Sequence, residues 1–216
     1  MRVAIFGDSF VRLFWHTWVE QVCKHFEWHV VLQQGFPGGA EYYVLESLTD
    51  LLNNRDDIDL VLFAHTEPSR LPNNQRIGIN YVTVTQPRDP RIPQEIFDAA
   101  KEYYENLYYE RFHQDIHHLI VADIQKICRE RKIRQIHLQS FDQTIPRNHG
   151  MWITNGLYNV ADELQPEGWH QDKNIRNHFL PELHDKFAAW LIQHIEFYLK
   201  SDTDLHIVNL SSDDLR

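Results

Sequence analysis

Short apolar segments alternate with longer amphipathic segments along the chain, and this alternation restricts the fold more than any other feature of the sequence. Residues 59–64 form the most continuously apolar segment, which is typical of a strand buried on both faces of a parallel sheet. Strands are predicted at residues 2–6, 29–32, 59–64, 133–138 and 151–154, and helices at 10–26, 42–52, 96–131 (as one or two helices) and 181–199. This order predicts a doubly wound α/β sandwich whose ligands bind beyond the carboxyl ends of the strands.

The chain reads as a single domain. Its 216 residues are enough for one sizeable core, and no break in composition divides them. We predict a domain over residues 1–200 and a loose, acidic C-terminal tail at 201–216. Residues 72–93 hold four prolines, which predicts a long loop of the kind that often lies over a functional site.

The charge of the chain limits its partners. A formal net charge of −10 argues against a nucleic-acid-binding surface, which normally carries a basic stripe. No apolar stretch approaches the roughly 18 residues of a membrane span, so no membrane span is expected. The first strand leaves no room for a signal peptide, and a cytoplasmic protein is therefore expected.

Ser9 is the first candidate for chemistry. It follows the apolar run at residues 3–6 and Gly7, which permits a sharp turn between the first strand and the next helix. At a helix N-terminus, free N–H groups and the helix dipole favour the negative charge that develops during acyl transfer to a serine. The alternative is that Ser9 only caps the helix.

Other polar groups are predicted to reach the same edge of the sheet. Gly38-Gly39 and the segment 65–67 each follow a strand, and His178 lies just before the last helix. An imidazole at that edge could take the proton of a serine hydroxyl, although the two residues are far apart in sequence. Arg70 would suit an anionic substrate group there, with a solvated surface arginine as the simpler interpretation.

These segments resemble the sequence blocks of the SGNH, or GDSL-type, hydrolases, whose fold is a three-layer α/β/α sandwich with a flavodoxin-like parallel sheet. Gly7-Asp8-Ser9 resembles the nucleophile block, and residues 34–40 resemble the second block, in which the N–H of Gly39 helps to form the oxyanion hole. Asn177-His178 resembles the last block, with its catalytic histidine. The insertion at about 70–115 has no clear counterpart in the family.

The chain departs from the family pattern at two positions. The third block normally supplies an asparagine to the oxyanion hole, whereas this chain has Thr66, whose hydroxyl could donate instead or could merely cap a turn. The sequence at 65–70 is similar to the third block of bacteriophage-encoded hydrolases of this type. The family aspartate three residues before the histidine is replaced by Ile175, and the nearest upstream carboxylate is Asp172. Asp172 or a backbone carbonyl would then orient His178.

The resemblance implies an esterase that forms an acyl-enzyme on Ser9, with His178 as general base and Ser9 N–H, Gly39 N–H and Thr66 around the oxyanion. Its substrate would be a small acyl ester or an O-acetylated carbohydrate. No cofactor or metal is implied, since His113 and His117 share a helical spacing but lack a third ligand. The alternatives are a catalytically silent binding or structural domain with this fold, and an acyltransferase.

Overall fold

The computed structural model describes residues 1–12, 16–141, 144–165, 178–201 and 203–216. Six parallel strands form one sheet in the order β2-β1-β3-β4-β5-β6. The strands are β1 (Arg2–Gly7), β2 (His29–Gly35), β3 (Leu60–His65), β4 (Arg134–Gln139), β5 (Gly150–Thr154) and β6 (Leu205–Asn209). The predicted α/β sandwich with a flavodoxin-like sheet is confirmed, since the first five strands follow the order 2-1-3-4-5.

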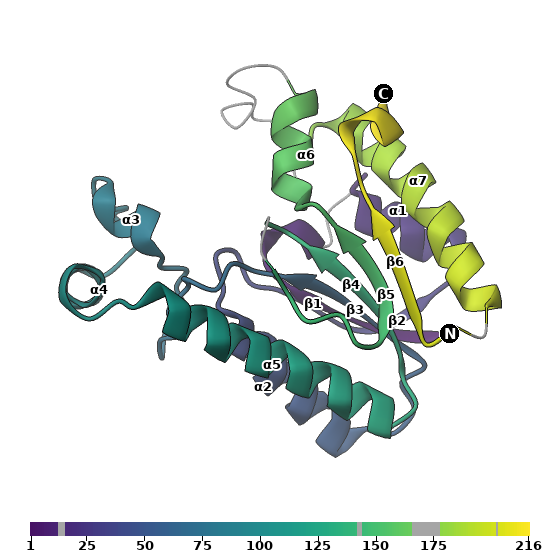
Figure 1. Cartoon of the computed structure of the whole chain (residues 1–216), viewed down its shortest axis with the longest axis horizontal. Coiled ribbons are helices and arrows are strands. Elements are labelled where there is room, and N and C mark those ends of the chain that lie inside the picture. The colour runs from purple at the N-terminus through teal and green to yellow at the C-terminus, as the bar shows by residue number, and fades with distance from the viewer. Residues whose placement is uncertain (13–15, 142–143, 166–177, 202) are drawn as a thin grey trace.

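Helices cover both faces of the sheet (Figure 1). The α-helices are α1 (Trp18–His25), α2 (Glu41–Asn54), α3 (Tyr81–Thr85), α4 (Gln94–Asn106), α5 (Glu110–Glu130), α6 (Leu157–Leu164) and α7 (Pro181–Lys200). Alternate side chains of β1 point to opposite faces of the sheet. Val3 and Ile5 pack in the cluster beneath α1, α6 and α7, whereas Ala4 and Phe6 pack beneath α2 and α5. No helix within the described residues has the length and apolarity needed to cross a membrane.

The strand register brings the first three loops to one edge. Gly7 at the end of β1 is aligned with Gly35 of β2 and Ala64 of β3. Gly7 has a φ of 150°, and a Cβ added there would lie 2.5 Å from Ala64 O. Only glycine therefore allows β1 and β3 to stay this close while the chain turns into the segment that carries Ser9.

The helix predicted at 10–26 is shorter in the structure. A 3-10 helix, η1, covers Ser9–Val11, and α1 starts only at Trp18, where the Thr17 side chain caps it. The long segment 96–131 forms two helices, α4 and α5, which is one of the two predicted arrangements.

The segment predicted as a loop at 72–93 is partly helical. α3 lies within it, and its N-terminus is closed by a capping box between Asn80 and Thr83. Together with α4 it forms a small hydrophobic cluster of its own, which includes Ile79, Phe97 and Tyr104. Both helices project beyond the end of the sheet in Figure 1.

The prediction of a loose C-terminal tail is wrong. Residues 205–209 form β6, which pairs in parallel with β5 at the edge of the sheet, and a second 3-10 helix, η3 (Ser212–Leu215), follows. The side chains of Leu210 and Leu215 are buried in the core beneath α7. β6 is short, its residues are exposed or half-buried, and polar residues at 201–204 and 211–214 flank it, so the segment resembles a solvated tail in sequence.

The tail should therefore contribute to stability. We expect Leu210→Ala, which removes a fully buried side chain, to lower the free energy of unfolding by about 2–5 kcal/mol in urea denaturation. Ile207→Thr in β6 is the matched control, because Ile207 is 46 % exposed and threonine keeps a high strand propensity. Equal and small effects of the two substitutions would contradict the assigned packing.

Candidate active site

Ser9 and His178 meet at the carboxyl edge of the sheet. The Ser9 Oγ lies 2.6 Å from the His178 Nε2, across a sequence separation of 169 residues. Ser9 is the first residue of η1, directly after β1, and His178 precedes α7 by a few residues. A serine hydroxyl at this distance can pass its proton to a neutral imidazole.

Asp8, not Ser9, caps the short helix. The Asp8 Oδ1 accepts a hydrogen bond from the Phe10 N–H at 3.0 Å, and the Ser140 Oγ donates to the same oxygen at 3.2 Å. The Ser9 hydroxyl is therefore free of the capping role, and the Ser9 N–H belongs to the first helical residues, which have no acceptor within the helix. Burial raises the pKa of Asp8 to about 6, against the opposing charge of Arg70.

Gln165 fixes the backbone around His178. Its Nε2 donates to the His178 carbonyl at 3.2 Å, and its Oε1 accepts from the Leu180 N–H at 2.5 Å. His178 has a φ of 65°, a left-handed conformation that non-glycine residues seldom adopt without such support. The imidazole also stacks on Phe10, with ring centroids 4.6 Å apart. The amide of Gln165 and the ring of Phe10 thus hold the histidine toward Ser9.

The surroundings of His178 favour its neutral form. Burial of the ring and the positive charge of Arg70 lower the pKa of His178 to about 4. At neutral pH the ring is therefore uncharged and able to accept a proton from Ser9. Asp172, predicted to orient this ring, lies outside the described residues, as does Ile175.

The Gly39 N–H already has a partner. It donates to the Phe36 carbonyl at 2.8 Å, closing a tight turn after β2. A Cβ added at Gly39 would lie 2.5 Å from the Phe36 Cβ, so the turn requires glycine. Sequence alone assigned this N–H to the oxyanion hole, and the structure gives it an acceptor within the turn.

A buried carboxylate joins the loops after β2 and β3. Glu41, two residues after Gly39, accepts hydrogen bonds from the His65 Nδ1 at 2.8 Å and from the Thr66 N–H at 3.0 Å. All three residues are buried. The backbone of Thr66 is thereby fixed against the first turn of α2, so the predicted oxyanion position depends on a residue that sequence analysis did not single out.

A chain of hydrogen bonds leads from Gln135 through His137 and His65 to Glu41, and the donor and acceptor of each bond can be assigned. The Gln135 Nε2 donates to the carbonyl of Gln125 at 3.2 Å, which leaves its Oε1 facing the His137 Nε2 at 3.1 Å. Burial and the charge of His65 lower the pKa of His137 well below its usual range. The neutral ring therefore donates from Nε2 and accepts at Nδ1.

The assignment of donors and acceptors extends to His65. Its Nε2 lies 2.8 Å from the His137 Nδ1 and must donate there, while its Nδ1 donates to Glu41. Burial alone would raise the pKa of Glu41, but the charge of His65 and the nearby His117 lower it far below its ordinary value. Glu41 is therefore a carboxylate, and His65 carries both ring protons beside it.

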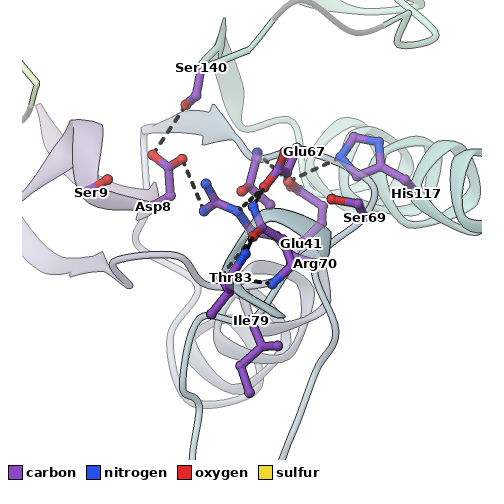
Figure 2. A network of polar contacts seen from close by, with 12 residues as sticks. Asp8, Ser9, Glu41, Glu67, Ser69, Arg70, Ile79, Thr83, His117 and Ser140 are labelled. Atoms are coloured by element: carbon purple, nitrogen blue, oxygen red, sulfur yellow. Dashed lines mark hydrogen bonds and ion pairs between the residues drawn. The ribbon is translucent and has the colours of Figure 1, made fainter. Parts of the chain in front are cut away.

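Arg70 is buried in the site and is not the solvated arginine that was the simpler interpretation. Only 9 % of its side chain is exposed, and Figure 2 shows the guanidinium between Asp8 and Glu67. The Nε lies 3.1 Å from the Glu67 Oε1, the Nη1 lies 3.5 Å from the Asp8 Oδ2, and the guanidinium carbon lies 4.9 Å from the centre of the Phe141 ring. Two carboxylates thus compensate its charge, which limits its suitability for an anionic substrate group.

The histidines considered for zinc have other partners. The His113 Nε2 lies 2.6 Å from the Tyr103 hydroxyl, and the His117 Nε2 lies 3.5 Å from the Glu41 Oε2. Within the described residues, no group of three or more histidine, cysteine, aspartate or glutamate side chains is arranged to hold a metal ion.

Comparisons with known proteins give weak likenesses. No family model and no curated protein matches the chain. Among solved structures it is similar to an acetyl xylan esterase, AlAXEase, with a TM-score of 0.42 and 10 % identity, covering 100 % of this chain and 80 % of that one. It is also similar to a GDSL-like lipase from Bacteroides thetaiotaomicron, with a TM-score of 0.38 and 15 % identity, covering 96 % and 67 % of the two chains. Likenesses at this level carry no argument about this chain, and its function has to be argued from its own residues.

The low pKa of His178 can be tested directly. In imidazole NMR spectra we expect His178 to titrate with a midpoint near pH 4, because burial and Arg70 disfavour its charged form. Arg70→Met removes the positive charge and should raise this midpoint toward the ordinary value of about 6.5. The His178 signals are identified by their loss in His178→Gln. A wild-type midpoint near 6.5 would contradict the described burial.

Proposed function

We propose that the chain is a serine hydrolase that cleaves an ester through an acyl-enzyme on Ser9. The observation that carries the proposal is the 2.6 Å approach of the Ser9 Oγ to the His178 Nε2. At neutral pH the His178 ring is uncharged, as a general base must be before attack, although its low pKa makes it a weak base.

Each step then has a definite proton balance. The Ser9 oxygen attacks the ester carbonyl carbon while its proton passes to the His178 Nε2. The tetrahedral intermediate collapses, the carbon–oxygen bond to the alcohol breaks, and His178 returns the proton to the leaving oxygen. A water molecule, deprotonated by the same nitrogen, attacks the acyl carbon. The bond from that carbon to the Ser9 Oγ then breaks, and His178 returns the proton to this oxygen, which releases the acid and restores Ser9. Asp172 is proposed as the acid that orients the His178 ring.

The oxyanion of the intermediate needs donors that are already in place. We assign this role first to the Ser9 N–H, which its position at the start of η1 leaves available. The Thr66 hydroxyl is the second donor, and Glu41 is the positioning residue that fixes the Thr66 backbone. The Gly39 N–H joins them only by releasing or sharing its hydrogen bond to Phe36. The substrate class is a small acyl ester, with O-acetylated carbohydrate among its members.

Covalent labelling tests the nucleophile. We expect a fluorophosphonate probe to modify wild-type protein at Ser9, as located by mass spectrometry. Labelling and turnover of p-nitrophenyl acetate should fall by at least about 10³-fold in Ser9→Ala and in His178→Ala, because the pair acts as a unit.

Ser212→Ala is the matched control for this experiment, because Ser212 is also the first residue of a 3-10 helix and should leave labelling unchanged. Unchanged turnover in folded Ser9→Ala would overturn the mechanism. If folded wild-type protein is not labelled at all, the catalytically silent domain is the better description. Product analysis with added alcohols separates hydrolysis from acyl transfer.

Glu41 should affect catalysis more than substrate binding. Glu41→Gln leaves one acceptor oxygen for two donors, so either the His65 Nδ1–H or the Thr66 N–H faces an amide NH₂. We expect kcat for p-nitrophenyl acetate to fall by up to about 10²-fold, with KM changed by less than about threefold. Glu46→Gln on the same helix, which removes only an exposed ion pair to Arg76, is the control. A wild-type kcat in folded Glu41→Gln would exclude the positioning role.

A further inference from the structure

We propose that a cavity beside the loops after β2 and β3 binds the acyl group of the substrate, and that this group is a medium-length apolar chain with a hydrogen-bonding oxygen near its far end. The proposal rests on the proposed ester hydrolysis and adds to it the class of acid that is released.

The cavity has a volume of about 260 Å³, and its lining is mostly apolar. Ala40 at the start of α2, Pro68 in the loop after β3, and Phe112, Ile116 and Ile120 on α5 contribute to it. A dry cavity of about 150 Å³ can hold benzene, so this one has room for about ten non-hydrogen atoms. An acetyl group would leave most of it empty.

The cavity lies next to the reaction site. Ala40 follows Gly39 directly, and Arg70, which also lines the cavity, places its Nη1 3.5 Å from the Asp8 Oδ2, one residue from Ser9. Figure 2 shows Arg70 spanning the space from Asp8 to Glu67, which is a further lining residue. Under the proposal, a chain attached to an acyl group on Ser9 reaches the cavity past the Arg70 side chain.

The position of the cavity relative to His178 indicates which part of the substrate it holds, the acyl group or the alcohol. His178 must return its proton to the leaving oxygen, so the alcohol lies on the histidine side of the carbonyl carbon. The described lining residues come from α2, from the loop after β3 and from α5, and none comes from α6 or α7, the helices that flank His178. The cavity thus lies beside the loops after β2 and β3, away from the helices that flank His178, and the proposal assigns it to the acyl group and not to the alcohol.

His117 indicates a polar atom on the ligand. Its side chain lines the cavity and is only 3 % exposed; its Nε2 faces the Glu41 carboxylate, whereas its Nδ1 has no hydrogen-bond partner among the described residues. The nearest charged atom, the Glu41 Oε2, is 3.5 Å from Nε2. A buried polar group without a hydrogen bond is destabilising. An oxygen on the acyl chain, such as a ketone or hydroxyl, would satisfy the Nδ1.

The acyl-chain profile of the whole protein tests the proposal. We expect kcat/KM for p-nitrophenyl hexanoate to exceed that for the acetate by at least about tenfold, because the additional methylene groups are buried. The dodecanoate should fall below the hexanoate, since its chain exceeds the cavity. In Ile116→Trp the indole fills the cavity, and the hexanoate-to-acetate ratio should drop to about one. Leu119→Trp, on the same helix but 67 % exposed and outside the lining, should keep the wild-type ratio. An unchanged ratio in Ile116→Trp would overturn the proposal.

The role of His117 is tested with p-nitrophenyl 5-oxohexanoate. We expect wild-type protein to prefer it to the hexanoate by about fivefold, the effect of one hydrogen bond. His117→Phe, which keeps the ring without its nitrogens, should abolish this preference. A preference that survives in His117→Phe would overturn the assignment of the polar atom.

A direct binding measurement separates this proposal from the proposed function. Saturation-transfer NMR of 5-oxohexanoate should show binding to Ser9→Ala protein and loss of binding in the Ser9→Ala, Ile116→Trp double variant. If binding is observed but no ester is turned over, the hydrolase proposal fails and the cavity assignment stands. If esters are turned over by Ser9 without chain-length preference or binding, the cavity assignment fails alone.

Discussion

The buried ion pair of Glu41 and His65 determines how the loops at the edge of the sheet are held. Two charges are taken out of water, which is strongly unfavourable unless each is paired and hydrogen-bonded. Here the carboxylate accepts from His65 and Thr66, and the imidazolium donates on its other side to His137. Removing either member would leave an uncompensated charge in the core. The start of α2 and the end of β3 are therefore locked to each other, although they belong to separate loops.

A second set of charges governs the reacting pair. The buried guanidinium of Arg70 is compensated by Glu67 and Asp8, and its positive charge lowers the pKa of His178. A nearby carboxylate would have the opposite effect on the imidazole. The described surroundings thus keep the His178 ring neutral but make it a weak base, because they disfavour the charged ring. The group that stabilises the imidazolium during the reaction has to come from elsewhere, which is the role proposed for Asp172.

Much of the fold could be predicted because buried parallel strands leave a strong apolar signal. The edge strand β6 could not, since its five residues are only half-buried or exposed and lie between polar residues at 201–204 and 211–214. The place of Ser9 at the edge of the sheet was predictable from topology, because strands of a parallel sheet end at one edge. The place of His178 was indicated by its position before the last helix and by the resemblance to a family block. Gln165 and Glu41 were not, since their roles depend on the direction of individual hydrogen bonds. The spacing of Glu41 from Gly39 is the one signal that could have drawn attention to it.

The inserted segment between β3 and α5 is structurally part of the site. The Asn80 Nδ2 donates to Glu67, and the Tyr104 hydroxyl donates to the carbonyl of Ser69, so α3 and α4 are attached to the loop that carries Arg70. That loop lines the cavity on one side, and α5, which follows the insertion, lines it on the other. A short connection from β3 to α5 would remove these attachments. Glu67, which pairs with Arg70, would then lose its hydrogen bond from Asn80. The insertion therefore supports both the charge of Arg70 beside His178 and one wall of the cavity.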